Sequence, residues 1–107
     1  MNKIVEEYFK AFSNKDLTTL SELYHNDVVL WEWGTHVYMG KPQVLEANAV
    51  LFNSAERVTV LLQKSSSQEN NHFCELVILL DDKIVSVVDV ITIVDDKIIS
   101  IQAYRGF

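Results

Sequence analysis

The chain has few of the residues that build disulfide frameworks, phosphate-binding loops or flexible linkers. It contains one cysteine, Cys74, three glycines and one proline in 107 residues. A single cysteine excludes an internal disulfide framework and a zinc site built from thiolates of this chain alone. Three glycines leave no room for a glycine-rich phosphate loop, and one proline excludes a proline-rich linker.

Positive charge is also scarce. Nine Lys and Arg residues stand against fifteen Asp and Glu residues, which gives a formal net charge of −6 with histidine neutral. Nucleic-acid backbones and anionic membranes attract basic surfaces, so an acidic chain has no electrostatic footprint for either. We therefore expect no nucleic-acid partner and no membrane partner.

Long hydrophobic runs are absent. The longest apolar stretch, Leu76 to Leu80, is far shorter than the roughly 18 residues of a membrane-spanning helix. At the start of the chain, Glu6 and Glu7 occur before the apolar core of a signal peptide could form. We expect a soluble, cytoplasmic protein.

Hydrophobic residues are abundant, at 49%, whereas charged residues make up 22%. This balance supports a buried core and excludes an intrinsically disordered chain. Because 107 residues are fewer than a typical domain contains, we expect residues 1–107 to form one domain.

The first half of the sequence predicts three helices. In the first, apolar residues recur at helical spacing from Ile4 to Phe12. Asp16 is placed to cap a second, short helix, and Gly40-Lys41-Pro42 opens a third that continues to about Phe52, with the proline in its first turn. A compact strand, Val28 to Trp33, is expected between the second and third helices.

The second half predicts strands. Residues 56–63 alternate in polarity, and a polar segment at 64–71 is expected to be a loop and the most mobile part of the chain. Three β-rich runs follow, separated by Asp81-Asp82 and Asp95-Asp96, which suit two tight hairpins. The run 83–94 is long enough that its sheet should bend. This order predicts an α+β fold, with three N-terminal helices packed in the concave face of a curved, mostly antiparallel sheet and a pocket between them.

Asp89 is the most informative single residue. It is the only polar residue on a strand face that otherwise carries Val85, Val87, Ile91 and Ile93. An ionised carboxylate on an apolar face is costly unless it is paired, so we expect Asp89 to have a raised pKa or to find hydrogen-bond donors. It is either a functional acid or a carboxylate satisfied by its neighbours for structural reasons.

Glu32 and Tyr8 are the next candidates. Glu32 shares a strand face with Val28 and Leu30, opposite Trp31, so it points inward if the tryptophans point outward. If the faces are reversed, Glu32 is an ordinary solvated charge at a strand end. Tyr8 lies on the apolar stripe of the first helix, where a tyrosine is either a core residue with a wet hydroxyl or a hydrogen-bond donor.

Metal ligands are not grouped in this sequence. The three histidines, His25, His36 and His72, are scattered, and the segment His72-Phe73-Cys74 offers only two ligands on one strand face. We expect no metal site and no cofactor.

Several short motifs resemble the nuclear transport factor 2-like superfamily, which includes the SnoaL-like polyketide cyclases and the Δ5-3-ketosteroid isomerases. They span almost the whole chain, and they are Val5-Glu6-Glu7-Tyr8-Phe9-Lys10-Ala11-Phe12, Lys15-Asp16-Leu17, Leu23-Tyr24, Asp27-Val28, Gly40-Lys41-Pro42 and Asp96-Lys97-Ile98-Ile99. The resemblance implies a cystatin-like, conical sheet wrapped around three helices, usually paired as a homodimer.

The resemblance also implies roles for the three candidates. Aligned with the ketosteroid isomerases, Tyr8 matches their oxyanion-binding tyrosine, Glu32 their general-base aspartate and Asp89 their protonated oxyanion-binding aspartate. The implied reaction is proton transfer next to a carbonyl, with the oxyanion held by two neutral donors. By analogy with epoxide-hydrolase relatives, Arg57 or Arg105 would pair with a buried acid, unless both are surface residues.

Two classes of function therefore remain. One is a cofactor-free isomerase- or cyclase-type enzyme that moves a proton on a small, mostly apolar carbonyl compound. The other is a non-catalytic ligand-binding or dimeric assembly domain. The enzyme requires Glu32 and Tyr8 to line one cavity. The outward face that carries Val29, Trp31 and Trp33 predicts a homodimer.

Overall fold

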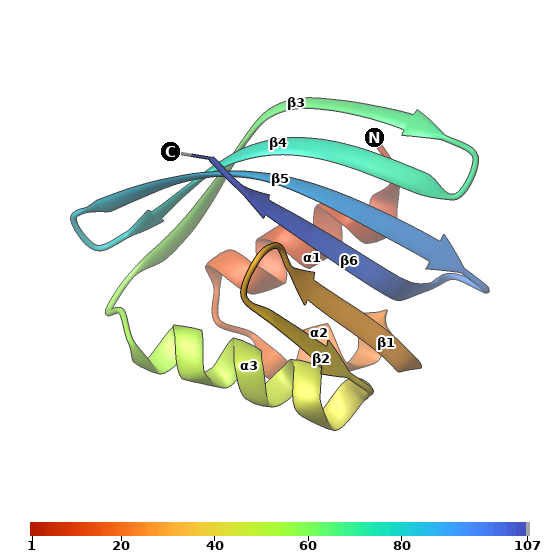
Figure 1. Ribbon diagram of the computed structural model, residues 1–107, viewed down its shortest axis with the longest axis horizontal. Coiled ribbons are helices and arrows are strands. Elements are labelled where there is room, and N and C mark those ends of the chain that lie inside the picture. Colours follow the sequence, from red (N-terminus) through yellow and green to blue (C-terminus); the bar gives the residue numbers. More distant parts are fainter. Residues whose placement is uncertain (107) are drawn as a thin grey trace.

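The structure is a computed structural model that describes residues 1–106. These residues form three helices and six strands. Two helices come first, two strands and a third helix follow, and four consecutive strands end the order (Figure 1). The elements are α1 (Lys3–Ser13), α2 (Leu17–Leu23), β1 (Tyr24–Glu32), β2 (His36–Met39), α3 (Lys41–Asn53), β3 (Val58–Gln68), β4 (Asn71–Leu80), β5 (Lys83–Val94) and β6 (Lys97–Arg105).

Each helix begins at a residue suited to that position. The Asn2 side chain accepts a hydrogen bond from the Ile4 amide at 2.7 Å, and the Asp16 side chain accepts one from the Thr19 amide at 3.0 Å. Both satisfy amides that have no partner within a helix. Gly40, with φ of 89°, precedes α3 and adopts a backbone conformation that other residues rarely take. The predicted helices are confirmed within a residue or two.

The six strands form one curved sheet in the order β2-β1-β6-β5-β4-β3. All neighbouring strands are antiparallel except β1 and β6, which are parallel. In Figure 1, α1 and α2 lie behind the sheet and α3 runs along its lower edge, so the helices cover one face only. We call this the inner face and the opposite one the outer face. This confirms the predicted fold class.

The tight hairpins are also confirmed. Leu80 pairs with Lys83 and Val94 with Lys97, so each loop contains two residues. Asp95 and Asp96 have φ of 54° and 58°. Positive φ at both loop residues is the conformation that a two-residue hairpin with a type I′ turn requires. The long strand β5 is irregular against β6 at Thr92 and Ile93, which is consistent with the predicted bend.

The strands differ from the sequence predictions in three respects. The polar segment 64–71 is not a loop, because β3 continues to Gln68 and β4 resumes at Asn71. Its serines pair with β4 in a long hairpin arm, where backbone hydrogen bonds outweigh the low strand preference of polar side chains. The short strand β2 has no counterpart among the sequence predictions, and β1 starts four residues earlier than Val28.

The core lies between the inner face and the helices. Aromatic rings of the helices meet there: the Phe12 and Phe52 centroids are 5.0 Å apart in an edge-to-face arrangement. Burying an apolar side chain of this size contributes about 1.5–3 kcal/mol. The largest fully buried side chains are Tyr24, Leu20, Leu76, Ile91, Ile98 and Ile101.

No helix within residues 1–106 is both long enough and apolar enough to cross a membrane.

Candidate functional site

The sheet register places two carboxylates in one row on the inner face. Asp89 of β5 pairs with Ala103 of β6, and Ala103 pairs with Glu32 of β1. Glu32 follows the buried residues Val28 and Leu30 at two-residue intervals, so it shares their face. With a strand spacing of about 4.8 Å, the Asp89 and Glu32 Cα atoms are roughly 10 Å apart. Ala103 is the residue between them in this row.

Asp89 is buried, with an exposed fraction of 6%. Within residues 1–106 its carboxyl group makes no side-chain hydrogen bond and no ion pair. No polar side-chain atom in that part of the chain is both fully enclosed and without a partner, so the carboxyl oxygens keep some contact with solvent. Burial raises its pKa to about 7, because a charged carboxylate loses its hydration there. The predicted direction of the pKa shift is confirmed, and burial is its cause.

Tyr8 lies beside Asp89 in a buried polar cluster, which we define as Tyr8, Tyr24, Asn48, Cys74 and Asp89. The Tyr8 and Tyr24 ring centroids are 6.2 Å apart, and Tyr24 Oη donates to Asn48 Oδ1 at 2.6 Å. Burial raises the pKa of Tyr8 well above its usual value, and Tyr24 and the Asp89 carboxylate raise it further. Tyr8 therefore remains a neutral hydrogen-bond donor.

Tyr24, Asn48 and Cys74 belong to this cluster but are not among the site residues predicted from the sequence. A signal was present, since Asn48 is a buried amide on the side of α3 that also carries Val44 and Phe52. A buried amide on an apolar stripe needs a partner, and Tyr24 supplies it. The pKa of Tyr24 is raised by burial.

Cys74 faces Asp89 directly across β4 and β5 and is fully buried. Burial, with a smaller contribution from Asp89, raises the pKa of its thiol to about 11. The thiol is therefore protonated at neutral pH and unsuited to act as a nucleophile.

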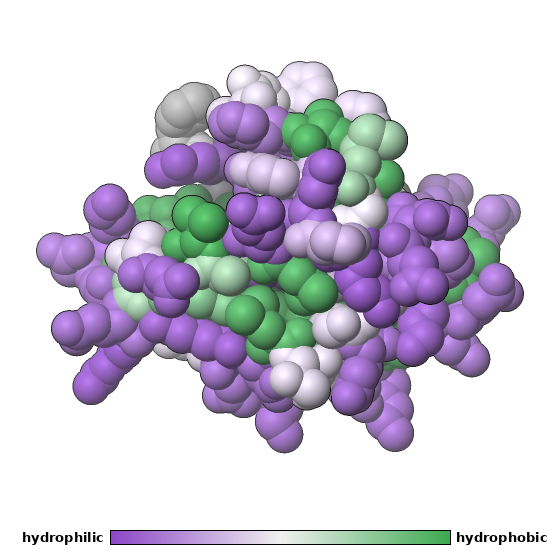
Figure 2. Space-filling view, turned by 90° about the horizontal axis from the view of Figure 1, so that it is seen from below, coloured by the Kyte–Doolittle hydropathy of each residue, from purple (hydrophilic) through white to green (hydrophobic). Residues whose placement is uncertain are grey.

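Glu32 lies in different surroundings, because its side chain is exposed. It lines a cavity of about 620 Å³ between the β1–β2 hairpin and α3, which we call the α3 groove. Seen from the α3 side in Figure 2, hydrophobic side chains gather across the middle of this face, with polar ones around them. The residues that line the groove are Glu32, Tyr38, Gln43, Glu46, Ala47, Val50, Leu51 and Ser54.

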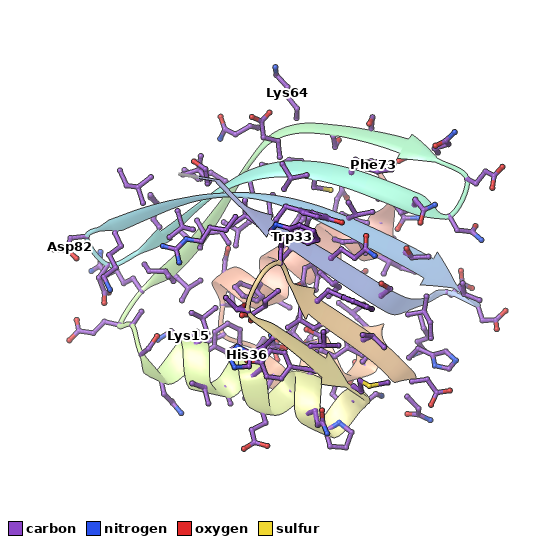
Figure 3. All side chains as sticks on the ribbon, in the orientation of Figure 1. Lys15, Trp33, His36, Lys64, Phe73 and Asp82 are labelled. Atoms are coloured by element: carbon purple, nitrogen blue, oxygen red, sulfur yellow. The ribbon has the colours of Figure 1, made fainter. Side chains whose placement is uncertain are left out.

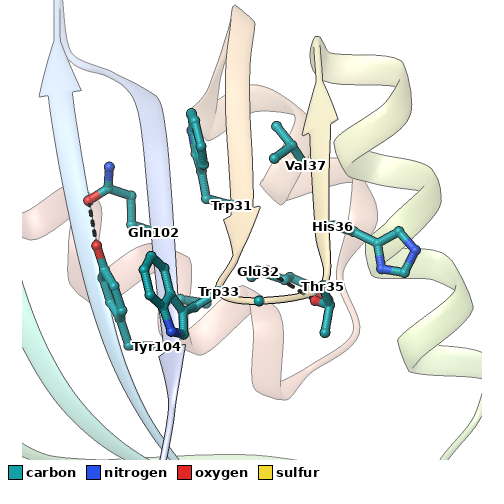
Figure 4. Close-up of a pocket in the computed structure, with 10 residues that line it drawn as sticks. Trp31, Glu32, Trp33, Thr35, His36, Val37, Gln102 and Tyr104 are labelled. Carbon is teal, nitrogen blue, oxygen red and sulfur yellow. Dashed lines mark hydrogen bonds between the residues drawn. The ribbon is translucent and has the colours of Figure 1, made fainter.

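A second cavity, of about 350 Å³, lies on the outer face beside the turn of the same hairpin. Trp31, Trp33, Val37 and Tyr104 surround it, and the Trp33 and Tyr104 rings are 5.5 Å apart (Figure 4). We call it the outer-face pocket. The tryptophans point outward, so Glu32 points to the helix side, as one of the two alternatives predicted. The Glu32 side chain is nevertheless exposed to solvent, because it lies at the end of its strand.

The three predicted site residues are thus only partly brought together. Tyr8 and Asp89 meet in the buried cluster, whereas Glu32 shares their row of the sheet but faces the α3 groove. Neither Tyr8 nor Asp89 lines the α3 groove or the outer-face pocket.

The remaining histidines and arginines form no site of their own. His72 is buried and hydrogen-bonds with Ser67 at 2.8 Å, and His36 points toward α3 and stacks on Tyr38 (Figure 3). Arg57 and Arg105 are exposed and make no ion pair with other described residues. In the described part of the chain, no three His, Cys, Asp or Glu side chains are grouped to hold a metal ion.

Comparison with known proteins gives a family and a fold. The family model described as SnoaL-like domain matches residues 5–101. No curated protein matches the chain. A candidate polyketide cyclase from Sinorhizobium meliloti superposes with a TM-score of 0.87 at 21% identity, over 97% of this chain and 95% of that one.

Two further solved structures have the same fold. A hypothetical protein from Catenulispora acidiphila, with a ketosteroid isomerase-like fold and in complex with trimethylamine, gives a TM-score of 0.86 at 18% identity, over 97% of this chain and 85% of that one. An uncharacterised cystatin-fold protein from Novosphingobium aromaticivorans gives 0.86 at 14%, over 96% of both chains. These TM-scores establish the cystatin-like fold, whereas sequence identities this low do not establish an activity.

Proposed function

The chain belongs to the SnoaL-like domain family, and from this premise we propose that it binds a small, mostly apolar carbonyl compound and catalyses a proton transfer on it without a cofactor. The observation that carries the proposal is the row Glu32–Ala103–Asp89. It sets an exposed carboxylate and a buried carboxyl group on one face, roughly 10 Å apart, with the smallest side chain between them. A ligand lying over Ala103 would contact both.

The two carboxyl groups suit opposite roles. Glu32 acts as the base: its carboxylate removes a proton from the carbon next to the carbonyl, the C–H electron pair forms a C=C bond, and the π pair of the C=O bond moves to the oxygen. Asp89, with a pKa of about 7, holds its proton in much of the population at neutral pH and donates a hydrogen bond to that oxygen. Tyr8 donates the second hydrogen bond. Glu32 then returns the proton to the same carbon or, where the compound is unsaturated at the next bond, to the γ-carbon of the dienolate, and the C=O bond re-forms.

Exchange of substrate protons with deuterated water tests this reaction directly. Small cyclic ketones incubated with the protein in D₂O should lose their α-protons, as followed by NMR, faster than in buffer. Glu32→Gln and Asp89→Asn should each lower the exchange rate by at least about 100-fold, the range expected for loss of a general base or an oxyanion donor. The control Glu75→Gln removes the same charge from the outer face and should leave the rate unchanged. Exchange that is no faster than in buffer, or equal in Glu32→Gln, refutes the enzyme.

One observation favours a second candidate, a non-catalytic ligand-binding domain. The α3 groove contains Glu32 but neither Tyr8 nor Asp89. A ligand confined to that groove meets one member of the proposed catalytic set, and the buried polar cluster then has a structural role only. Ligand binding without any proton exchange would establish this candidate.

We also propose that the protein is a homodimer that pairs through the part of the outer face formed by the β1–β2 hairpin and the end of β6, away from Glu75 of β4. Trp33 is 70% exposed and Trp31 is 48% exposed, and the exposed Val37 and Tyr104 lie beside them. Monomeric proteins rarely expose such a contiguous apolar surface. Sedimentation should give a dimer at micromolar concentration, and Trp31→Glu should convert it to a monomer. A stable wild-type monomer at that concentration contradicts the proposal.

A further inference from the structure

The α3 groove has one apolar wall. Val50, Leu51 and Ala47 of α3 line it, and Val50 is 66% exposed. A volume of about 620 Å³ lies within the range of small-molecule sites, which are mostly apolar with a few placed polar groups. The wall therefore suits the hydrocarbon part of a small ligand.

Two polar side chains of the groove are already engaged with the protein. Gln43 Oε1 accepts a hydrogen bond from the Met39 amide at 2.9 Å, and Ser54 Oγ donates to the Leu51 carbonyl at 2.6 Å. The side-chain NH₂ group of Gln43 keeps its donors. The polar groove side chains that make no hydrogen bond with other described residues are Glu32, Glu46 and Tyr38.

These three groups all favour positive charge. Within residues 1–106, neither Glu32 nor Glu46 has a basic nitrogen within ion-pair distance. Tyr38 is half-buried, and the Glu32 carboxylate lies close enough to add to the effect of burial in raising its pKa. Tyr38 contributes an aromatic ring, and aromatic rings attract cations. His36 stacks on this ring with centroids 5.8 Å apart but does not line the groove.

We propose that the α3 groove binds an organic cation, namely a protonated or quaternary amine with an aliphatic body. The ammonium group lies between Glu32 and Glu46 beside the Tyr38 ring, and the aliphatic body packs on Val50, Leu51 and Ala47. The net charge of −6 adds long-range attraction for such a ligand. The proposal goes beyond the proposed function, because it assigns the groove a ligand of its own, and the two share only the placing of a small molecule beside Glu32.

Three probes with one hydrocarbon tail and different head groups test the charge preference. Hexyltrimethylammonium, 1-hexanol and hexanoate are titrated into the full chain at low salt, and binding is followed by calorimetry and by NMR shifts. The cation should bind about tenfold more tightly than the alcohol, the anion should not bind, and the cation's advantage should shrink at high salt. The largest shifts should occur at Tyr38 and along residues 46–51.

Matched variants locate the charge. Glu46→Gln should weaken binding of the cation about two- to fivefold without changing binding of the alcohol, and the Glu32→Gln/Glu46→Gln double variant should remove the preference for the cation. Glu75→Gln, which makes the same charge change on the outer face, should leave cation binding unchanged. Equal binding of cation and alcohol, no binding of the cation, or equal effects of Glu46→Gln and Glu75→Gln overturn the proposal.

Asp89→Asn separates this proposal from the proposed function. Asp89 does not line the groove, so this variant should lower proton exchange by at least about 100-fold and keep the affinity for the cation. Cation binding without exchange in the wild type would retain the groove and reject the enzyme. Proton exchange on neutral ketones without cation binding would do the reverse.

Discussion

Asp89 and Glu32 occupy one row of one sheet face, but their environments are opposite. Asp89 is enclosed by α1, β4 and the start of β1, with Tyr8, Tyr24 and Cys74 around it. Glu32 is the last residue of β1, where the row reaches the open groove beside α3. Two strand spacings therefore separate a carboxyl group that holds its proton toward neutral pH from a carboxylate in contact with water.

The difference shows that position along a row, as well as the face of the sheet, sets the chemistry of a polar residue. The inner face excludes water only where helices lie against it. Asp89 is covered and has no hydrogen-bond partner among residues 1–106, whereas Glu32 is beyond the covered area. An acid and a base can thus come from the same residue class when the environment separates them.

The largest expected effect is on the pH dependence of folding, and it tests the buried end of the row. A carboxyl group whose pKa rises from 3.8 when unfolded to about 7 when folded makes the native state bind more protons than the unfolded state between those values. Stability should therefore fall from pH 4 to pH 7, by up to about 4 kcal/mol at 1.36 kcal/mol per pH unit, and level off above pH 7.

Asp89→Asn should remove this loss. We expect the variant and the wild type to have similar unfolding free energies near pH 4, and the variant to be the more stable by a few kcal/mol at pH 7.5. Urea unfolding at the two pH values measures the difference. A variant that is less stable than the wild type at pH 7.5 would identify Asp89 as a paired structural anion and would remove it from the oxyanion-binding role.

The next effect concerns the hydrogen bond inside the buried cluster. Tyr24→Phe removes the hydroxyl that donates to Asn48 Oδ1 and leaves that oxygen buried without a donor. The loss should lower the unfolding free energy by about 1–3 kcal/mol. Tyr38→Phe is the matched control at the open end, where the hydroxyl makes no hydrogen bond with other described side chains and its loss should cost less than about 0.5 kcal/mol.

Most of the fold could be predicted from the sequence because its signals are local. Asp16 indicates the start of a helix, Pro42 fits a first helical turn, and Asp95-Asp96 fits a two-residue hairpin. The polar arm around Ser65–Ser67 could not be predicted, because its strand character comes from pairing with β4 and not from its own side chains.

Less of the candidate site than of the fold could be predicted from the sequence. The burial of Asp89 follows from the apolar residues around it in β5, and the direction of its pKa shift was predicted correctly. The partnership of Tyr24 with Asn48 depends on how α3 packs against β1, and the groove at Glu32 depends on where α3 ends its cover of the sheet. These are relations between elements that no single segment encodes.

The smallest expected effect tests whether the two ends of the row are independent. Two charges roughly 10 Å apart interact by about 0.4 kcal/mol through water and by several times more through a dry interior. Because Glu32 is exposed, we expect the weaker interaction. Glu32→Gln should change the unfolding free energy by less than about 0.5 kcal/mol, and it should move the midpoint of the Asp89 carboxyl titration, followed by NMR, by less than about half a pH unit.

The Asp89 titration in Glu75→Gln gives the background for loss of one outer-face charge. A fall of a full pH unit or more in Glu32→Gln would mean that the two carboxyl groups lie in one water-poor space. The separation of the α3 groove from the buried polar cluster would then be wrong, and a ligand at Glu32 would be in direct reach of Asp89.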